Sequence, residues 1–170
     1  MTDTARRILG VDTALRSTGV AVVEARGQQL GSVEHGLIRN AASLPLSTCL
    51  MNLHKGIVDM IARTQPGAVA IEGVFFSRNV KTSVTLGEAR GVVIAACATA
   101  GLPVYEYSPR RVKQALVGYG AAEKDQVRQM VMSILGLREP PAEDAGAALA
   151  LAICHLHSKT GYAALAPKAI

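Results

Sequence analysis

The sequence predicts an α/β fold in which a mixed sheet, made of an antiparallel meander and parallel strands, is flanked by helices. Two patterns predict it: three short β-favouring runs open the chain, and amphipathic stretches then alternate with short apolar runs. The chain has 170 residues, of which 49% are hydrophobic and 18% charged, which suits one compact domain. We expect a single domain over residues 1–170, with its core at 7–157 and a loose tail at 158–170.

The meander comes first. Residues 8–11, 20–23 and 31–38 are short β-favouring runs punctuated by glycine, a pattern typical of consecutive antiparallel strands. Asp12 follows the first run directly, so an acidic side chain is expected where that strand ends.

A helix and a buried strand are predicted next. Apolar residues recur at steps of three and four, as on the buried face of an amphipathic helix, and Pro66 and Gly67 end this pattern. Residues 68–71 are a continuous run of small apolar side chains that suits a buried strand, and they deliver Glu72 at its carboxyl end. The helical positions are Leu46, Leu50, Leu53, Ile57, Met60 and Ile61.

The rest of the chain continues the alternation. A long helix is expected at 80–100 and a further buried strand at 104–107. Ser108 followed by Pro109 has the form of an N-cap with proline at the first helical position, so a short helix starts there. Two more helices are predicted at 122–135 and 142–157.

The charge balance favours an anionic partner. Lysine and arginine number 18 against 13 aspartates and glutamates, which gives a formal net charge of +5. Nucleic acid is the first candidate, although a mild positive charge also serves solubility alone.

Cysteine usage and the N-terminus indicate a cytoplasmic protein. Cys49, Cys97 and Cys154 are widely spaced and form no Cys-x-x-Cys pair, which predicts buried reduced thiols rather than a zinc site or disulfides. The first residues lack the apolar run of a signal peptide, and no apolar stretch is long enough to span a bilayer.

Three acids stand at the ends of apolar elements. Asp12 and Glu72 each follow a predicted strand, and Asp144 lies in the first turn of the last helix. Taken singly, Asp12 could simply begin a turn and Asp144 could be an ordinary helix N-terminal acid. Glu72 is harder to explain this way, because a charge within a buried run is costly unless it is paired or bound to a metal. Together they would suit hard divalent cations.

The motifs around these acids resemble the RuvC family of Holliday junction resolvases. The resemblance covers residues 7–157, nearly the whole chain, and implies a ribonuclease H-like fold. Its motifs, in order, are Leu9-Gly10-Val11-Asp12, Ala70-Ile71-Glu72-Gly73-Val74-Phe75, Leu86-Gly87-Glu88-Ala89-Arg90-Gly91, Val112-Lys113-Gln114-Ala115-Leu116-Val117-Gly118 and Ala122-Glu123-Lys124.

The resemblance implies a pair of Mg²⁺ ions in each subunit, or Mn²⁺ in their place, held by Asp12, Glu72 and Asp144. The family's fourth ligand is an aspartate three residues further along the last helix, which falls on Ala147. Positions three apart share a helix face, so this alanine removes an oxygen from the site. Engineered inactivation, natural degeneration and compensation by Glu143 would each account for it. Compensation is awkward, since adjacent helical residues point about 100° apart.

Several other residues take DNA-binding roles by the same resemblance. Phe75 matches an aromatic that stacks on bases at the junction, although Phe75 or Phe76 could equally be core. Lys113 and Lys124 match lysines near the reacting phosphate, and both are assigned to the catalytic set with the three acids. The patch could extend over Arg78, Lys81, Arg110, Arg111 and Arg128, each of which could also be ordinary solvated surface.

The expected activity is cleavage of two opposed strands of a four-way DNA junction by a homodimer, through metal-activated water. The helix at 80–100, with its small residues, is the expected dimer interface. RuvA and RuvB are implied as partners, and no membrane is. The first alternative is a non-catalytic protein that binds junctions.

A sugar-kinase or actin-like ATPase is the second alternative, because residues 9–19 resemble its phosphate loop. That fold needs two domains and a second such loop, which this chain lacks. His155 and His157 lie two apart on a helix and so point to different sides, which argues against a shared metal ion.

Overall fold

The computed structural model describes residues 6–73, 77–158 and 167–170. One five-stranded sheet runs through the middle of the molecule in the order β3-β2-β1-β4-β5. Its strands are β1 (Arg6–Asp12), β2 (Ser17–Arg26), β3 (Gln29–Arg39), β4 (Ala68–Glu72) and β5 (Val104–Tyr107). The helices are α1 (Leu46–Thr64), α2 (Val80–Thr99), α3 (Pro109–Val117), α4 (Lys124–Leu135) and α5 (Glu143–His157).

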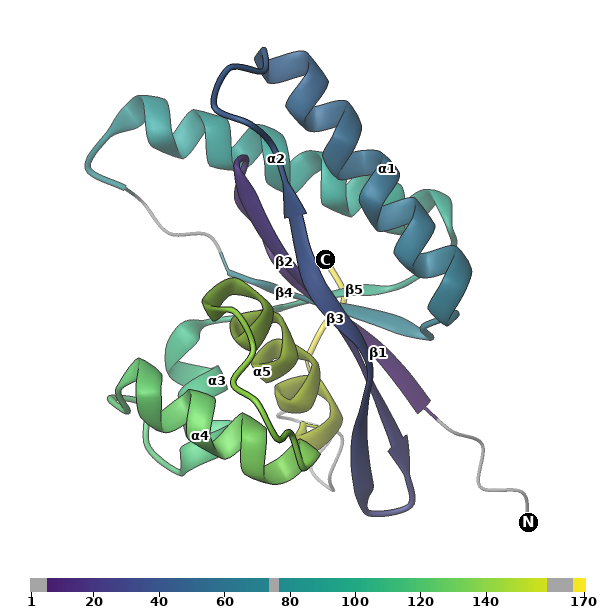
Figure 1. Cartoon of the computed structure of the whole chain (residues 1–170), viewed down its shortest axis with the longest axis vertical. Coiled ribbons are helices and arrows are strands. Elements are labelled where there is room, and N and C mark those ends of the chain that lie inside the picture. The colour runs from purple at the N-terminus through teal and green to yellow at the C-terminus, as the bar shows by residue number, and fades with distance from the viewer. Residues whose placement is uncertain (1–5, 74–76, 159–166) are drawn as a thin grey trace.

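The sheet is mixed, as the sequence predicts. β1, β2 and β3 pair antiparallel, whereas β4 pairs parallel with β1 and β5 parallel with β4. Helices α1 and α2 cover one face, and α3, α4 and α5 lie on the other (Figure 1). The predicted α/β fold, with its meander and parallel strands, is therefore confirmed.

Strand alternation divides the core into two layers. On β1, Leu9 and Val11 pack towards α1 and α2, whereas Ile8 packs towards α5. The α5 face is lined largely by small side chains on β2 and β4, including Ala21, Ala68 and Ala70. A helix can therefore lie close to the sheet on this side.

Two glycines bring α5 into direct contact with the sheet. A Cβ on Gly10 of β1 would stand 1.9 Å from the carbonyl oxygen of Ala148, and a Cβ on Gly19 of β2 would stand 1.9 Å from that of Asp144. No side chain fits in either place. The first turn of α5 is thus fixed against β2 beside Asp12, which pairs with Gly19 across the sheet.

The predicted ends of helix α3 agree with the structure, because capping residues define both ends. The Ser108 hydroxyl caps α3 by accepting a hydrogen bond from the Arg111 amide, and Gly118 ends that helix at a φ of 94°. The prediction of a loose tail is wrong for its last residues, because Ala169 bridges Tyr105 and the Ile170 amide donates to the Val104 carbonyl at 2.9 Å.

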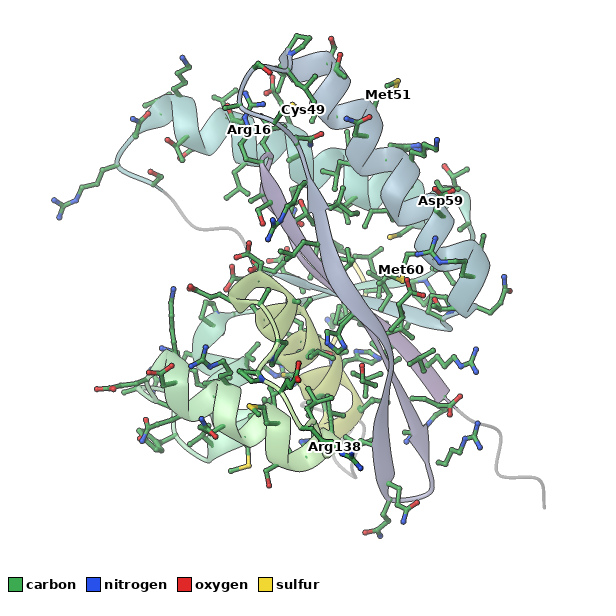
Figure 2. All side chains as sticks on the ribbon, in the orientation of Figure 1. Arg16, Cys49, Met51, Asp59, Met60 and Arg138 are labelled. Atoms are coloured by element: carbon green, nitrogen blue, oxygen red, sulfur yellow. The ribbon has the colours of Figure 1, made fainter. Side chains whose placement is uncertain are left out.

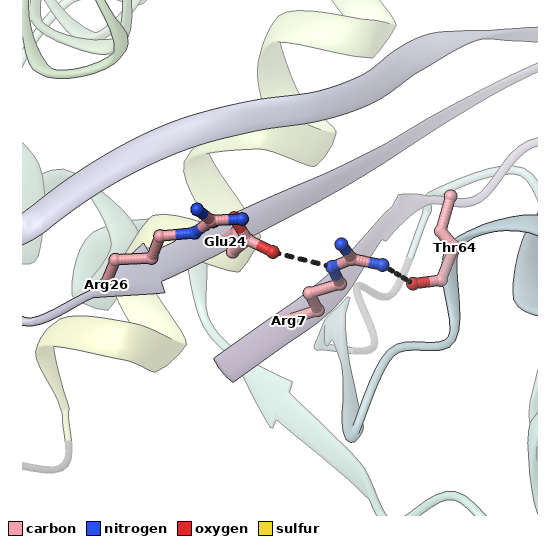
Figure 3. A network of polar contacts seen from close by, with 4 residues as sticks. All are labelled: Arg7, Glu24, Arg26 and Thr64. Atoms are coloured by element: carbon pink, nitrogen blue, oxygen red, sulfur yellow. Dashed lines mark hydrogen bonds and ion pairs between the residues drawn. The ribbon is translucent and has the colours of Figure 1, made fainter. Parts of the chain in front are cut away.

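An ion-pair network around Arg7 stabilises the start of β1 (Figure 3). Asp12 is the last residue of the same strand. Arg7 pairs with Glu24 at 2.8 Å and donates to the Thr64 carbonyl at 2.8 Å, while Arg26 pairs with the other Glu24 oxygen at 2.7 Å. These contacts tie β1, β2 and the end of α1 together.

The cysteine prediction agrees with the structure: Cys49, Cys97 and Cys154 are free and buried. Burial raises the pKa of Cys97 to about 12 and that of Cys154 to about 11, so both thiols stay protonated near neutral pH. In the described part of the chain, no helix has the length and apolar character needed to cross a membrane.

We expect Gly19→Ala to destabilise the protein by about 2 kcal/mol or more, because the added methyl group must push α5 away from β2. Gly31→Ala on β3 is the matched control, since a Cβ there meets nothing within 4 Å. Urea unfolding of both variants checks this expectation, and equal stability of the two would contradict the close contact.

Candidate active site

Three acids project from the α5 side of the sheet. Asp12 and Glu72 continue the alternation that places Ile8 and Gly10 of β1, and Ala68 and Ala70 of β4, on that side. The parallel register pairs Val11 with Ile71, so the two acids follow at matching positions on adjacent strands. Asp144 reaches the same edge from the first turn of α5.

The three acids line one open cavity of about 780 Å³ between the sheet edge and the helices α3, α4 and α5. Six of its lining residues are acidic and three are basic, which leaves a formal charge of minus three. The acids are Asp12, Glu72, Glu123, Asp125, Glu143 and Asp144, and the bases are Lys113, Lys124 and Arg128. Ala147 lines the same cavity beside Gly146 and Ala150.

Burial and mutual repulsion perturb the acids. Burial, followed by the negative charges of Glu72 and Asp144, raises the pKa of Asp12 to about 7, while Lys124 opposes the shift. Burial also raises the pKa of Glu72, again opposed by Lys124. The unfavourable charge on Asp12 is one that a bound cation would relieve.

Two of the three basic residues of the cavity, Lys124 and Arg128, are engaged with acids. Lys124 Nζ lies 2.7 Å from Glu143 Oε1, and Arg128 pairs with Asp125 at 3.1 Å. This hydrogen bond to Glu143 raises the pKa of Lys124. Glu143, the residue that could compensate for Ala147, thus lines the cavity but holds Lys124.

The loop after Asp12 is anchored by polar contacts. Asn40 Nδ2 donates to the Leu15 carbonyl at 2.9 Å, and Arg16 donates to the Ala41 carbonyl at 2.6 Å and contacts Cys49 Sγ at 3.1 Å (Figure 2). The Thr18 hydroxyl bonds the backbone of Ala14. These contacts fix the turn that carries Thr13 and Ala14.

The donor chemistry of the site fits Mg²⁺. Its oxygen donors are carboxylates, and Mg²⁺ is usually bound through one or two carboxylates while keeping several waters. Among the described residues, no three histidine, cysteine, aspartate or glutamate side chains converge to surround one ion. The site therefore suits a hydrated cation, with Asp12, Glu72 and Asp144 as candidate ligands and no oxygen from Ala147.

Of the remaining residues predicted to bind DNA, one lies outside the described residues and four lie outside the cavity lining. Phe75 lies outside the described residues. Within the described residues, the lining of the cavity does not include Arg78, Lys81, Arg110 or Arg111. The first three are exposed, whereas the Arg111 guanidinium lies 5.4 Å from the ring centre of Tyr107.

The two histidines of α5 have structural contacts. His155 is buried and its Nδ1 lies 2.7 Å from the Tyr107 hydroxyl. His157 is exposed, with its Nδ1 3.4 Å from the Ala115 carbonyl oxygen. They do not share a site, in line with their spacing.

Sequence reasoning missed a second contact in the site, besides the Lys124–Glu143 pair. Ser17, the first residue of β2, donates a hydrogen bond from its hydroxyl to Asp144 Oδ2 at 2.6 Å. Side chains alternate along a strand, so Ser17 is expected on the same face of β2 as Gly19 and Ala21. Nothing in the sequence indicates that α5 packs against that face.

The mixed sheet, its helical layers and the acidic cavity at the strand ends define a nuclease of the ribonuclease H-like class. The yeast mitochondrial Holliday junction resolvase Ydc2 shares this fold, with a TM-score of 0.66 at 9% identity over 89% of this chain and 78% of its own.

Comparison of sequences identifies the family within this fold class. The family model for crossover junction endodeoxyribonuclease RuvC matches residues 8–155. The RuvC of Desulfitobacterium hafniense is 46% identical over 152 residues, which cover 89% of this chain and 92% of the relative. The structure of T. thermophilus RuvC in complex with a Holliday junction substrate has a TM-score of 0.90 and 32% identity, covering 97% of this chain and 99% of that one. The chain belongs to the RuvC family.

Asp12 generates a prediction about stability and pH in metal-free buffer. Its pKa is about 7 in the folded protein against 3.8 for the free side chain, so between these values the folded state holds more protons and stability falls as pH rises. One pKa unit corresponds to about 1.4 kcal/mol. From pH 5 to pH 8, we expect the unmodified protein to lose about 1 to 3 kcal/mol more than Asp12→Asn.

Urea unfolding in the presence of EDTA measures both losses. Asp59→Asn, on the exposed side of α1 (Figure 2), is the matched carboxylate-to-amide control and should keep the loss of the unmodified protein. An identical pH dependence in Asp12→Asn and the unmodified protein would refute the assignment.

Proposed function

We propose that this chain is a four-way junction resolvase scaffold whose metal site lacks one ligand. The observation that carries the proposal is the gathering of Asp12, Glu72 and Asp144 in one cavity with Lys113, Lys124 and Arg128. Acidic and basic side chains together suit a phosphodiester, because the acids hold cations and the bases contact phosphate oxygens. The relative bound to a Holliday junction supports a branched DNA substrate.

The charge of the cavity makes divalent cations necessary in this proposal. A formal charge of minus three would repel a phosphate, and RuvC nucleases are metal-dependent in general. When bound, Mg²⁺ would offset the negative charge of the phosphate and lower the pKa of a coordinated water, which makes that water a better nucleophile. We expect a pair of ions in each subunit, as in the family, with Mn²⁺ able to replace them.

The side chains have separate roles in this proposal. Asp12, Glu72 and Asp144 hold the cations. Lys124, whose side chain is 85% exposed and paired with Glu143, would exchange that carboxylate for a phosphate oxygen. Lys113 on α3 also lines the cavity and would hold a neighbouring phosphate.

Ala147 supports the second candidate, a protein that binds junctions without cutting them. Ala147 lies on the cavity wall one helical turn from Asp144 and supplies no oxygen. The two candidates share the fold, the DNA substrate and the basic residues, and they differ in whether three acids suffice for cleavage.

We expect Ala147→Asp to cut a labelled synthetic four-way junction at least about 100-fold faster than the unmodified chain, because the added carboxylate would help to hold metal ions that supply several kcal/mol of transition-state stabilisation. Cleavage is measured with Mg²⁺ or Mn²⁺, and junction binding is measured separately for both proteins. The double variant Asp12→Asn/Ala147→Asp is the control and should bind but not cut.

The outcomes separate the candidates. Cleavage by Ala147→Asp alone supports the scaffold that lacks a ligand. Cleavage by the unmodified chain means that the site is compensated and the metal assignment is wrong. Binding without cleavage by either protein favours the non-catalytic candidate.

A homodimer is part of the proposal, because two sites related by a two-fold axis can act on two opposed strands. On α2, Val80 and Val84 are 75% and 55% exposed, and added Cβ atoms on Gly87 and Gly91 would meet nothing within 4 Å. These four residues follow steps of four, three and four and so share one helix face. We propose this face as the dimer interface.

We expect Gly91→Arg to weaken dimerisation at least about tenfold without unfolding the subunit, because the site is open in the single chain. Sedimentation velocity over a range of concentrations measures the change. Met51→Arg, at an exposed apolar position of α1 (Figure 2), is the matched control. Dissociation by Met51→Arg and not by Gly91→Arg would move the interface to α1.

Family membership also underlies two wider expectations. RuvA and RuvB stay predicted partners of the junction complex, and the cytoplasm stays the predicted location.

A further inference from the structure

A single hydrogen bond joins two distant segments at the candidate active site. Ser17 at the start of β2 donates from its hydroxyl to Asp144 Oδ2 in the first turn of α5, at 2.6 Å and across 127 positions of sequence. Both residues are half-buried. The contact lies within the framework that holds the acids rather than on the open surface.

We propose that Ser17 is a positioning residue that holds the Asp144 carboxylate for divalent cation binding, an inference that rests on the proposed function. Ser17 acts on the metal site through Asp144. A serine hydroxyl has one proton, and here the carboxylate takes it.

The fold explains why Ser17 is able to do this. Alternation along β2 puts Ser17 on the same face as Gly19 and Ala21, which is the face covered by α5. Gly19 lets the Asp144 backbone rest on the strand, since a Cβ there would stand 1.9 Å from the Asp144 carbonyl oxygen. With the backbone fixed by Gly19 and one carboxylate oxygen fixed by Ser17, Asp144 is held at both ends.

The chemistry explains why a hydroxyl suits the position. A carboxylate has two oxygens with about four lone-pair directions, so one donated hydrogen bond fixes its rotation and leaves Oδ1 available to a cation. The contact also offers no positive charge that would compete with the metal. Partners of this kind around metal ligands commonly change metal affinity by about 10- to 100-fold.

The missing acid at position 147 increases the dependence on this contact. Asp144 is the candidate ligand that α5 supplies, since Ala147 one turn later has no oxygen. Rotation of the Asp144 carboxylate away from the cavity would leave the two strand acids, Asp12 and Glu72, without the helix's contribution.

The test compares Ser17→Thr with Ser17→Val, which have side chains of similar shape suited to a strand but differ in the hydroxyl. Mn²⁺ alone is the probe, and its binding to the full chain is followed by the loss of the electron paramagnetic resonance signal of free Mn²⁺. We expect Ser17→Val to weaken Mn²⁺ binding about tenfold or more and Ser17→Thr to stay within about threefold of the unmodified protein.

Two controls isolate the effect. Ser32→Ala removes a strand hydroxyl that contacts His35 on β3, outside the cavity lining, and should leave Mn²⁺ affinity unchanged. Thermal unfolding without metal shows whether each variant is folded, and Ser17→Ala replaces Ser17→Val if valine prevents folding.

Equal Mn²⁺ affinity of the Thr and Val variants would overturn the positioning role and leave the proposed function standing. Absence of Mn²⁺ binding by the unmodified chain would overturn the metal site itself, and the inference with it. If the affinity for Mn²⁺ is equal in the two variants but lower than in the unmodified protein, Ser17 has a packing role, and the proposal is likewise overturned.

Discussion

The direct contact between the backbone of α5 and the sheet is the constraint on which the site depends. Gly10 and Gly19 leave room for the carbonyl oxygens of Ala148 and Asp144, each at 1.9 Å from where a side chain would begin. The helix cannot slide or tilt at these points without a clash, because protein interiors are close-packed. This contact sets the height of Asp144 above the strand ends that supply Asp12 and Glu72.

Much of the site followed from the sequence because it depends on periodicity. Alternation puts Asp12 and Glu72 on the same side as the small residues of β1 and β4, and the helical spacing puts Asp144 and position 147 on one face. What could not be predicted depends on three-dimensional packing. The Ser17 contact and the Lys124–Glu143 pair each join segments whose proximity exists only once the helices are placed. The return of Ala169 to β5 has no local signal either.

The distribution of charge separates the site from the rest of the molecule. The chain carries a net charge of +5, yet its cavity has three more acids than bases. In the proposed function, positive charge outside the cavity would attract a polyanion over long range, while the acidic cavity would bind small cations first. DNA and metal ions would therefore be attracted by charge of opposite sign on the same protein, and each would favour the binding of the other at the site.

The bridge between Tyr105 and Ala169 bears on how copies of this protein associate. β5 is an outer strand of the sheet, and the C-terminal residues occupy hydrogen-bonding groups on its open side, at Tyr105 and at the Val104 carbonyl. An outer strand is otherwise a template on which another chain can add a strand. At these two residues the sheet therefore cannot be extended by a strand from a second molecule.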